Sequence, residues 1–373
     1  MNSHDSILLA VTLALEGSIL LSAILFHVLP RISRRDIFFA VTVNPEFRGT
    51  AEGRGILRRF RIAVWSQSAV GAGIAGLAIA ARTPLVALVG VGWQVVAFIW
   101  AFLRARRQTL PHAGVPDSHR EAALVPRRTG GIGFALLQLG PFAILAASAI
   151  YIQLIWYRIP ERFPIHWGFD GRPNGWATRS FAGIYGLWLI GLLVCAFLEI
   201  LAFAILHWTR QIRSTGSDAQ NEAHFRRVQV GCMIAMEYFF ALIFNGIPFT
   251  ALRGNINQAP SILPFMLGTF GFMAVLIGIL IHTGQGGANL TAAGTSPDIT
   301  GSGKVTGDRT PDQCWRAGCF YVNPDDPAII VEKRFGIGYT FNFARPAAWL
   351  VTFLILCFPV AILVIVFHSV ARH

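Results

Sequence analysis

One connector between apolar stretches carries side chains that could bind a ligand. Residues 157–180 contain the candidates His166, Trp167, Asp170, Asn174, Trp176 and Arg179. Histidine titrates near neutral pH, so His166 could sense protons, contact a ligand or coordinate a metal. Alternatively, His166 is a hydrogen-bonded anchor that only fixes the loop. Glu161 and Asp170 are the nearest anionic residues, too few to favour a metal site.

Three acidic residues fall inside stretches that are otherwise apolar: Glu16, Glu199 and Glu237. A charge at the bilayer centre costs about 3 kcal/mol or more, so such residues usually face the interior of a helix bundle. The stretches that carry Glu199 and Glu237 run in opposite directions, so we expect these two carboxyl groups at similar depth. They could form a proton path or line a cavity. Alternatively, each is protonated and hydrogen-bonded to a nearby Gln, Asn or Ser.

The sequence offers no specific sign of catalysis or of a bound cofactor. It contains no nucleophile motif, no Gly-rich phosphate loop and no HExxH zinc motif. Cys314 and Cys319 have no histidine close enough in sequence to complete a zinc site. We therefore expect no cofactor and no metal. A non-enzymatic protein is favoured, with a membrane enzyme left as an alternative.

Positioning these residues requires membrane-spanning helices, each of roughly 20 mostly apolar residues. The chain is 54% hydrophobic and only 13% charged, whereas soluble domains carry about 25% charged residues. The start lacks a basic segment and a cleavage site, so we expect the first span to be retained. The sequence predicts an all-α integral membrane bundle with about eight transmembrane helices. The predicted spans are Ser6–Leu29, Ala63–Ala81, Leu85–Leu103, Gly131–Trp156, Phe181–His207, Val228–Phe249, Ser261–His282 and Ala347–Phe367.

The net charge of +12 is distributed as the positive-inside rule predicts for a membrane protein. Alternate loops hold 24 of the 31 basic residues. We therefore expect those loops in the cytoplasm and both termini outside, an arrangement that needs an even number of spans. The lipid bilayer explains the basic residues at the helix ends, and no nucleic-acid partner is predicted.

The apolar stretches and the loops between them suggest a serial domain organisation. Residues 284–312 are rich in Gly, Ser and Thr and predict a flexible linker. Residues 313–346 then predict a small cytoplasmic β unit, which pairing with Phe38–Val43 would support. The predicted divisions are 1–130 (three helices with basic loops), 131–207 (two helices with outer loop 157–180), 208–283 (two helices), 284–312, 313–346 and 347–373 (the last helix).

The outer loop resembles a bacterial membrane domain of unknown function. The resemblance rests on Pro164-Ile165-His166-Trp167, then Gly171, Pro173-Asn174, Trp176 and Arg179. Arg179 replaces the usual Lys, which keeps the charge, whereas Asn174 replaces the commoner Asp and removes an anionic group. This domain occurs in immunity and signalling proteins for a secreted killing peptide, the sporulation-delaying protein toxin. The resemblance implies an extracellular peptide or envelope component as ligand.

A second resemblance lies near the C-terminus. Residues 323–327 (Asn-Pro-Asp-Asp-Pro) and 333–338 (Lys-Arg-Phe-Gly-Ile-Gly), with Thr340, Asn342 and Phe343, look like a small cytoplasmic domain that often accompanies the first. The two resemblances imply an envelope sensor or an immunity-like protein whose β unit contacts a cytoplasmic partner. A transporter that uses the buried Glu residues is the alternative.

Overall fold

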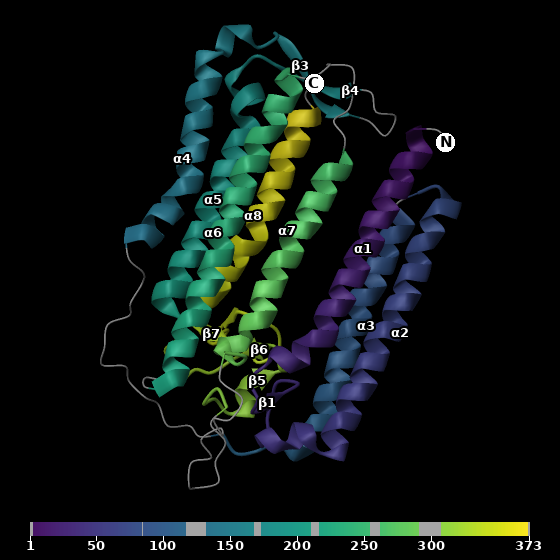
Figure 1. Ribbon diagram of the computed structural model, residues 1–373, viewed down its shortest axis with the longest axis vertical. Helices are drawn as coiled ribbons and strands as arrows, with labels where there is room; N and C mark the ends of the chain where they lie inside the picture. The colour runs from purple at the N-terminus through teal and green to yellow at the C-terminus, as the bar shows by residue number, and fades with distance from the viewer. Residues whose placement is uncertain are drawn as a thin grey trace. The chain divides into compact units, whose positions relative to one another are not determined.

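A computed structural model of the protein describes residues 3–83, 85–116, 132–167, 173–209, 216–253, 262–290 and 307–371. Its described residues form eight long helices and four two-stranded antiparallel sheets (Figure 1). The helices are α1 (Ser3–Ile32), α2 (Ala51–Ala81), α3 (Leu85–Thr109), α4 (Ile132–Leu154), α5 (Phe181–Trp208), α6 (Gly216–Arg253), α7 (Ile262–Thr283) and α8 (Pro346–Ala371). The predicted all-α bundle with a small β unit is confirmed.

Among the described residues, seven helices, α1 to α7, are long and apolar enough to cross a membrane, and α8 adds a shorter apolar segment, Pro346–Ala361. The chain is therefore a multi-pass membrane protein. Two helices are much longer than the predicted spans, because α2 begins at Ala51 and α6 at Gly216. Hydropathy detects only the part of a helix that matches the hydrocarbon layer. The extra turns of α2 begin at Thr50, whose hydroxyl accepts from the Gly53 amide at 3.1 Å.

The helices and sheets form two packing units that are interleaved along the chain. The first unit comprises Met1–Pro126, Trp208–Val228 and Thr269–Ala348, and the second comprises Arg127–His207, Gln229–Gly268 and Trp349–His373. The division predicted from the sequence was serial.

In the first unit, α2 and α3 approach each other closely through small residues. A Cβ built on Gly90 of α3 would overlap the carbonyl oxygen of Gly71 on α2. The buried Gln94 side chain adds polar contacts, since its amide donates to the Ile19 carbonyl at 2.8 Å and to the Ser68 hydroxyl at 2.9 Å. This close approach of two glycines matches the way small residues bring membrane helices together.

A small domain, here called the juxtamembrane domain, lies at the ends of these helices and comprises residues 33–50, 284–290 and 307–345. Its strands form three hairpins: β1 (Ile37–Phe38) with β2 (Val41–Thr42), β5 (Trp315–Arg316) with β6 (Phe320–Tyr321), and β7 (Ile330–Glu332) with β8 (Tyr339–Phe341). Strand pairing between the C-terminal β unit and Phe38–Val43 was wrong. In the described structure these two segments contact each other through side chains and not through paired strands. For example, the Thr42 hydroxyl donates to the Asp312 carboxylate at 2.8 Å.

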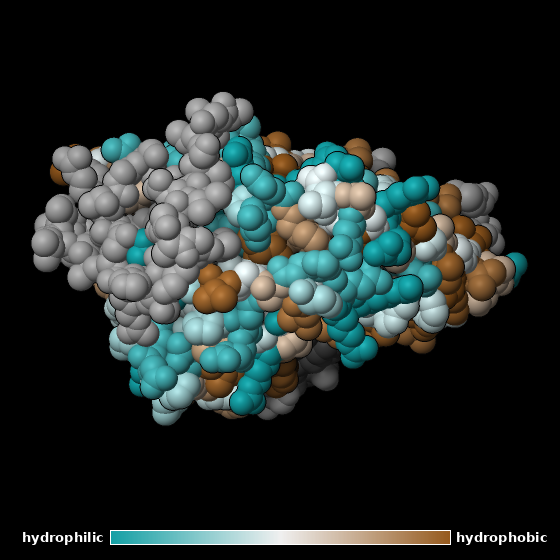
Figure 2. Space-filling view, turned by 90° about the horizontal axis from the view of Figure 1, so that it is seen from below, coloured by the Kyte–Doolittle hydropathy of each residue, from teal (hydrophilic) through white to brown (hydrophobic). Residues whose placement is uncertain are grey.

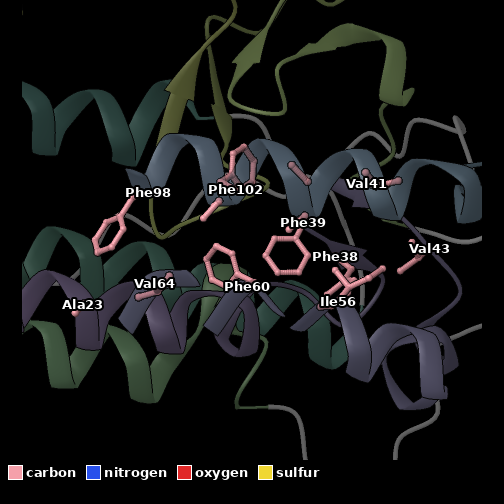
Figure 3. Close-up of a cluster of buried hydrophobic side chains, with 13 residues drawn as sticks. Ala23, Phe38, Phe39, Val41, Val43, Ile56, Phe60, Val64, Phe98 and Phe102 are labelled. Atoms are coloured by element: carbon pink, nitrogen blue, oxygen red, sulfur yellow. The ribbon is translucent and has the colours of Figure 1, made fainter. Parts of the chain in front are cut away.

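An aromatic cluster joins the juxtamembrane domain to the helices of the first unit (Figure 3). Phe39, from the turn between β1 and β2, packs edge-on against Phe60 of α2, with 4.9 Å between ring centroids. Phe335 completes the cluster, and its ring centroid lies 4.4 Å from that of Phe102 on α3. Both central residues of the β1–β2 turn, Phe39 and Ala40, have positive φ values of 45° and 60°. This conformation is unfavourable for residues other than glycine, so the surrounding packing must hold it.

The predicted linker 284–312 is described only at its two ends, and both ends are folded. At the first end, the buried Gln285 side chain donates to the Gly338 carbonyl at 3.0 Å and accepts from the Gly338 amide at 2.8 Å. At the second end, the Gly307 amide donates to the Asp36 carboxylate at 2.7 Å. Residues 291–306 lie outside the described part of the chain.

In the second unit, a β-hairpin fills the connector between α4 and α5. Strand β3 (Arg162–Trp167) pairs with β4 (Pro173–Thr178), with Phe163 opposite Ala177 and His166 opposite Gly175. Deeper in the unit, Leu145, Cys195 and Ala241 bring α4, α5 and α6 together in a buried cluster. The sequence predicted a structured loop here and left its strand pairing open.

Candidate functional site

The hairpin is fixed to the helix ends by one apolar face. Phe163 and Ala177 lie in a buried cluster with Ile159 and with residues of α4 and α5, including Ile184. Neighbouring strand residues point to the opposite face, and there the guanidinium carbon of Arg162 lies 5.2 Å from the centroid of the Trp176 ring. Arg162 is exposed. The hairpin therefore presents a cation–π pair on the side away from its packed face.

Arg179 holds the connector in place from the end of the hairpin. Its guanidinium donates to the carbonyls of Ile159 at 3.0 Å and Tyr157 at 3.3 Å. Its backbone amide donates to the Glu161 carbonyl at 2.8 Å, and the Glu161 carboxylate lies 3.8 Å away in a surface ion pair. Among the predicted ligand contacts, Arg179 thus has its Nη1 donors occupied by the loop itself.

The remaining predicted contacts in this loop are only partly described. The backbones of His166, Trp167 and Asn174 lie in the two strands, but their side chains are outside the described residues. Asp170 is wholly outside them. Ligand binding by these residues therefore stays a prediction.

Two of the three predicted buried acids lie together in the second unit. The Glu237 side chain on α6 is 0% exposed, and neither carboxylate oxygen has a hydrogen-bond partner among the described residues. Glu199 on α5 is an electrostatic neighbour of Glu237, and one of its oxygens accepts from the Gln138 amide at 2.7 Å. The proximity expected from opposite helix directions is therefore present.

Glu16 belongs to the first unit. A Cβ built on Gly76 of α2 would lie 3.5 Å from its carboxylate, so the small residue leaves space beside the acid. Glu16 is partly buried.

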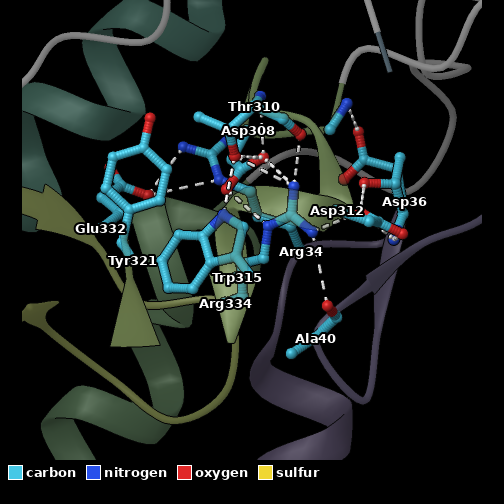
Figure 4. A network of polar contacts seen from close by, with 12 residues as sticks. Arg34, Asp36, Ala40, Asp308, Thr310, Asp312, Trp315, Tyr321, Glu332 and Arg334 are labelled. Carbon is cyan, nitrogen blue, oxygen red and sulfur yellow. Dashed lines mark hydrogen bonds and ion pairs between the residues drawn. The ribbon is translucent and has the colours of Figure 1, made fainter. Parts of the chain in front are cut away.

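The juxtamembrane domain contains a buried ionic network that the sequence did not predict (Figure 4). Arg334 is fully buried and bidentate to Asp308, with Nη2–Oδ1 and Nε–Oδ2 distances of 2.7 Å. It also pairs with Asp312, and its guanidinium carbon lies 5.2 Å from the ring centroid of Trp315. Burial opposes the charge of Arg334, but Asp308 and Asp312 outweigh it and raise the pKa of Arg334.

A second buried arginine joins three segments of the first unit. The Arg34 guanidinium lies 2.9 Å from carboxylate oxygens of both Glu222 on α6 and Glu332 on β7. Burial raises the pKa of Glu332, Arg34 opposes that rise, and Glu222 adds to it. The triad fixes the start of α6 to the juxtamembrane domain.

Several motif residues near the C-terminus have structural roles. The Asn342 side chain donates to the carbonyls of Asn323 at 2.9 Å and Asp326 at 3.0 Å. The Asp326 carboxylate accepts from the Tyr321 hydroxyl at 2.9 Å. These contacts close the Pro-bounded turn at 323–327, so this motif is explained by folding without any chemistry.

The arginine partners were missed because they are distant in sequence. Arg334 and Asp308 are 26 residues apart, and Arg34 and Glu332 are 298 apart. Asp308 also stands in a segment whose composition suggested a linker. No clear signal in the sequence pointed to them, because Arg334 directly follows the charged residues Glu332 and Lys333 and so resembles a surface residue.

Figure 2, the view from below Figure 1, shows hydrophilic side chains mixed with apolar ones over the described surface on that side.

Comparison with known sequences identifies two uncharacterised domains. A domain of unknown function (DUF1648) matches residues 143–192, which include the hairpin with parts of α4 and α5. A family of unknown function (DUF5808) matches residues 324–349, which run from the Pro-bounded turn to the start of α8. No curated protein and no solved structure has significant similarity to the chain. The matches are consistent with an uncharacterised membrane protein family.

Proposed function

We propose that this protein is a non-enzymatic sensor or immunity-like protein of the bacterial inner membrane, and that its hairpin recognises an extracellular peptide or envelope component. The observation that carries the proposal is the two-faced hairpin: a buried apolar face fixes it to α4 and α5, and Arg162 and Trp176 stand together on the other face. Arginine and tryptophan are among the residues that contribute most to binding at protein interfaces.

The orientation in this proposal rests on the basic residues of the alternate loops. It puts both termini and the hairpin outside and the juxtamembrane domain in the cytoplasm, where that domain would contact a protein partner. A two-stranded hairpin also leaves strand edges to which an extended peptide can add. The resemblance of the loop to the toxin-immunity domain supports a peptide as the ligand.

Substitution of Trp176 tests recognition by the hairpin. We expect Trp176→Ala and Arg162→Ala to keep the expression and melting temperature of the wild type, because the packed face is untouched. Both should fail to restore peptide resistance to a deletion strain that is challenged with a panel of membrane-active bacterial peptides. Loss of an interface anchor of this kind typically weakens binding by about 2 kcal/mol or more.

Two other arginines of the connector provide controls. Arg158 is exposed, so Arg158→Ala removes the same charge and should leave resistance intact. Arg179→Ala removes donors to two loop carbonyls and should lower stability by about 1–3 kcal/mol, with activity falling in proportion to protein abundance. If Trp176→Ala and Arg162→Ala protect cells as well as the wild type does, the hairpin is not the recognition site.

A second candidate function, transport coupled to protons, is supported by the Glu237 carboxylate, which has no hydrogen-bond partner in the described part of the chain and lies near Glu199. Ionisable residues inside a membrane bundle often carry protons or bind substrates. In this proposal the pair takes up and releases a proton as the substrate crosses.

The coupling between the two acids can be measured directly. We expect the effects of Glu199→Gln and Glu237→Gln on the free energy of unfolding to be non-additive by about 0.5–3 kcal/mol, because residues in one network influence each other. Gln153→Leu is the control partner for Glu237→Gln. Gln153 lies on α4, fifteen residues and so about 22 Å along the helix from Gln138, the residue that donates to Glu199. Gln153 accepts instead from the Tyr185 hydroxyl. Additive effects for both pairs would remove the support for transport.

A further inference from the structure

Four side chains form a basic and aromatic group between α1 and α2. His27 and Arg31 are one turn apart on α1, just before that helix ends at Ile32. Arg61 and Trp65 are one turn apart on α2, and the Trp65 indole donates to Nδ1 of His27 at 3.1 Å. Arg61 and Arg31 are electrostatic neighbours of His27, and Arg31 of Arg61. Three basic side chains thus meet at one place.

Arg61 has buried donors without an acceptor. Its Nε and Nη2 atoms are closed to solvent, yet neither has a hydrogen-bond partner among the described residues. Buried donors in proteins are nearly always paired. Two fully buried arginines show the contrast, since Arg34 and Arg334 each contact two carboxylates. An anion from outside the chain would satisfy Arg61 and reduce the repulsion between Arg61 and Arg31.

The arrangement indicates which anion fits. The Nε and Nη2 donors share one edge of the guanidinium plane, and that edge matches two oxygens of a phosphate group. Because Nδ1 of neutral His27 accepts from Trp65, its proton lies on Nε2, which is a further donor. Trp65 is 42% exposed, and tryptophan is enriched where the hydrocarbon layer meets the headgroups.

We infer that Arg61, assisted by Arg31 and His27, binds the phosphate of an anionic phospholipid headgroup in the leaflet next to the basic loops. The site holds the lipid against the α1–α2 interface. It is independent of the hairpin and of the buried glutamates, so it does not rest on either proposed function.

Lipid binding to the full-length protein tests this inference. Purified protein in a neutral detergent is titrated with short-chain phosphatidylglycerol, with phosphatidylcholine or with inorganic phosphate, and binding is followed by native mass spectrometry and by melting temperature. We expect phosphatidylglycerol to bind and stabilise the wild type. Arg61→Gln should weaken that binding about tenfold or more, because hydrogen bonds to charged groups are the strong ones.

Two further variants keep the outcome decisive. Arg58→Gln removes a charge from the exposed surface of the same helix and should bind lipid like the wild type. Arg61→Lys keeps the charge but loses the two-donor edge, so it should bind phosphatidylglycerol weakly, and it replaces Arg61→Gln if that variant does not fold. Equal loss in Arg58→Gln, full binding by Arg61→Lys, or equal stabilisation by phosphatidylcholine would overturn the inference. If inorganic phosphate stabilises the protein and phosphatidylglycerol does not, the site binds a free anion, and the proposal of a lipid ligand is wrong.

Discussion

Replacing Arg334 with methionine should lower the free energy of unfolding by about 3–5 kcal/mol, because the substitution leaves buried carboxylates without their cation. Asp308 and Asp312 have side-chain exposures of only 6% and 18%, so water cannot fully replace the guanidinium. Chemical unfolding of the purified protein in mixed micelles would measure the change. Arg316→Met is the control, since Arg316 is exposed on β5 and its loss should alter stability by no more than about 0.5 kcal/mol.

A double variant separates loss of the ion pair from loss of packing. If the cost comes from the unpaired carboxylates, adding Asp308→Asn to Arg334→Met should destabilise by less than the sum of the two single changes. Strictly additive effects, or a cost below about 1 kcal/mol for Arg334→Met alone, would show that the network does not stabilise the domain in this way.

Replacing Gly90 with alanine should also destabilise the protein, by about 1–3 kcal/mol, because overpacking forces neighbouring groups apart. A Cβ at this position meets backbone atoms of α2, including the amide nitrogen of Ala75 at 2.9 Å, and backbone cannot rotate away. Gly92→Ala is a matched control on the same helix, where an added Cβ meets nothing within 4 Å. It should stabilise α3 by up to about 1 kcal/mol.

Melting temperatures of the two glycine variants in the same detergent would give the comparison. Equal stability of Gly90→Ala and Gly92→Ala would mean that α2 and α3 do not rely on close backbone approach. The same pair of variants distinguishes this effect from any general response of the helix to alanine.

Apolar stretches predicted the helices well, because a bilayer demands long uncharged segments and the chain has few other ways to satisfy it. Helix ends were predicted less well, since α2 and α6 begin at Ala51 and Gly216, in stretches whose charged residues had argued against a span. The hairpin was predicted only as a structured loop. Its sequence marks the turn residues clearly, but strand register depends on which face finds a buried cluster.

The sequence could likewise predict some parts of the candidate sites but not others. Glu199 and Glu237 could be placed together from helix direction and position, which are one-dimensional properties of the sequence. The partners of Arg34 and Arg334 could not be found, because their pairing depends on how distant segments fold back on one another. The sequence also could not predict that Arg61 has donors without a partner among the described residues, because this depends on which groups surround the side chain in the folded protein.

Phe335 closes an aromatic cluster whose other core members lie within residues 23–105. The ribosome makes Phe335 about 230 residues after Phe102 and its neighbours, and at about 5–20 residues per second this interval lasts roughly ten seconds or more. During that time Phe39, Phe60 and Phe102 lack their final aromatic neighbour. Nascent chains of this protein therefore present an unfinished apolar surface beside the membrane, and a chaperone or an insertion factor has a defined interval in which to cover it.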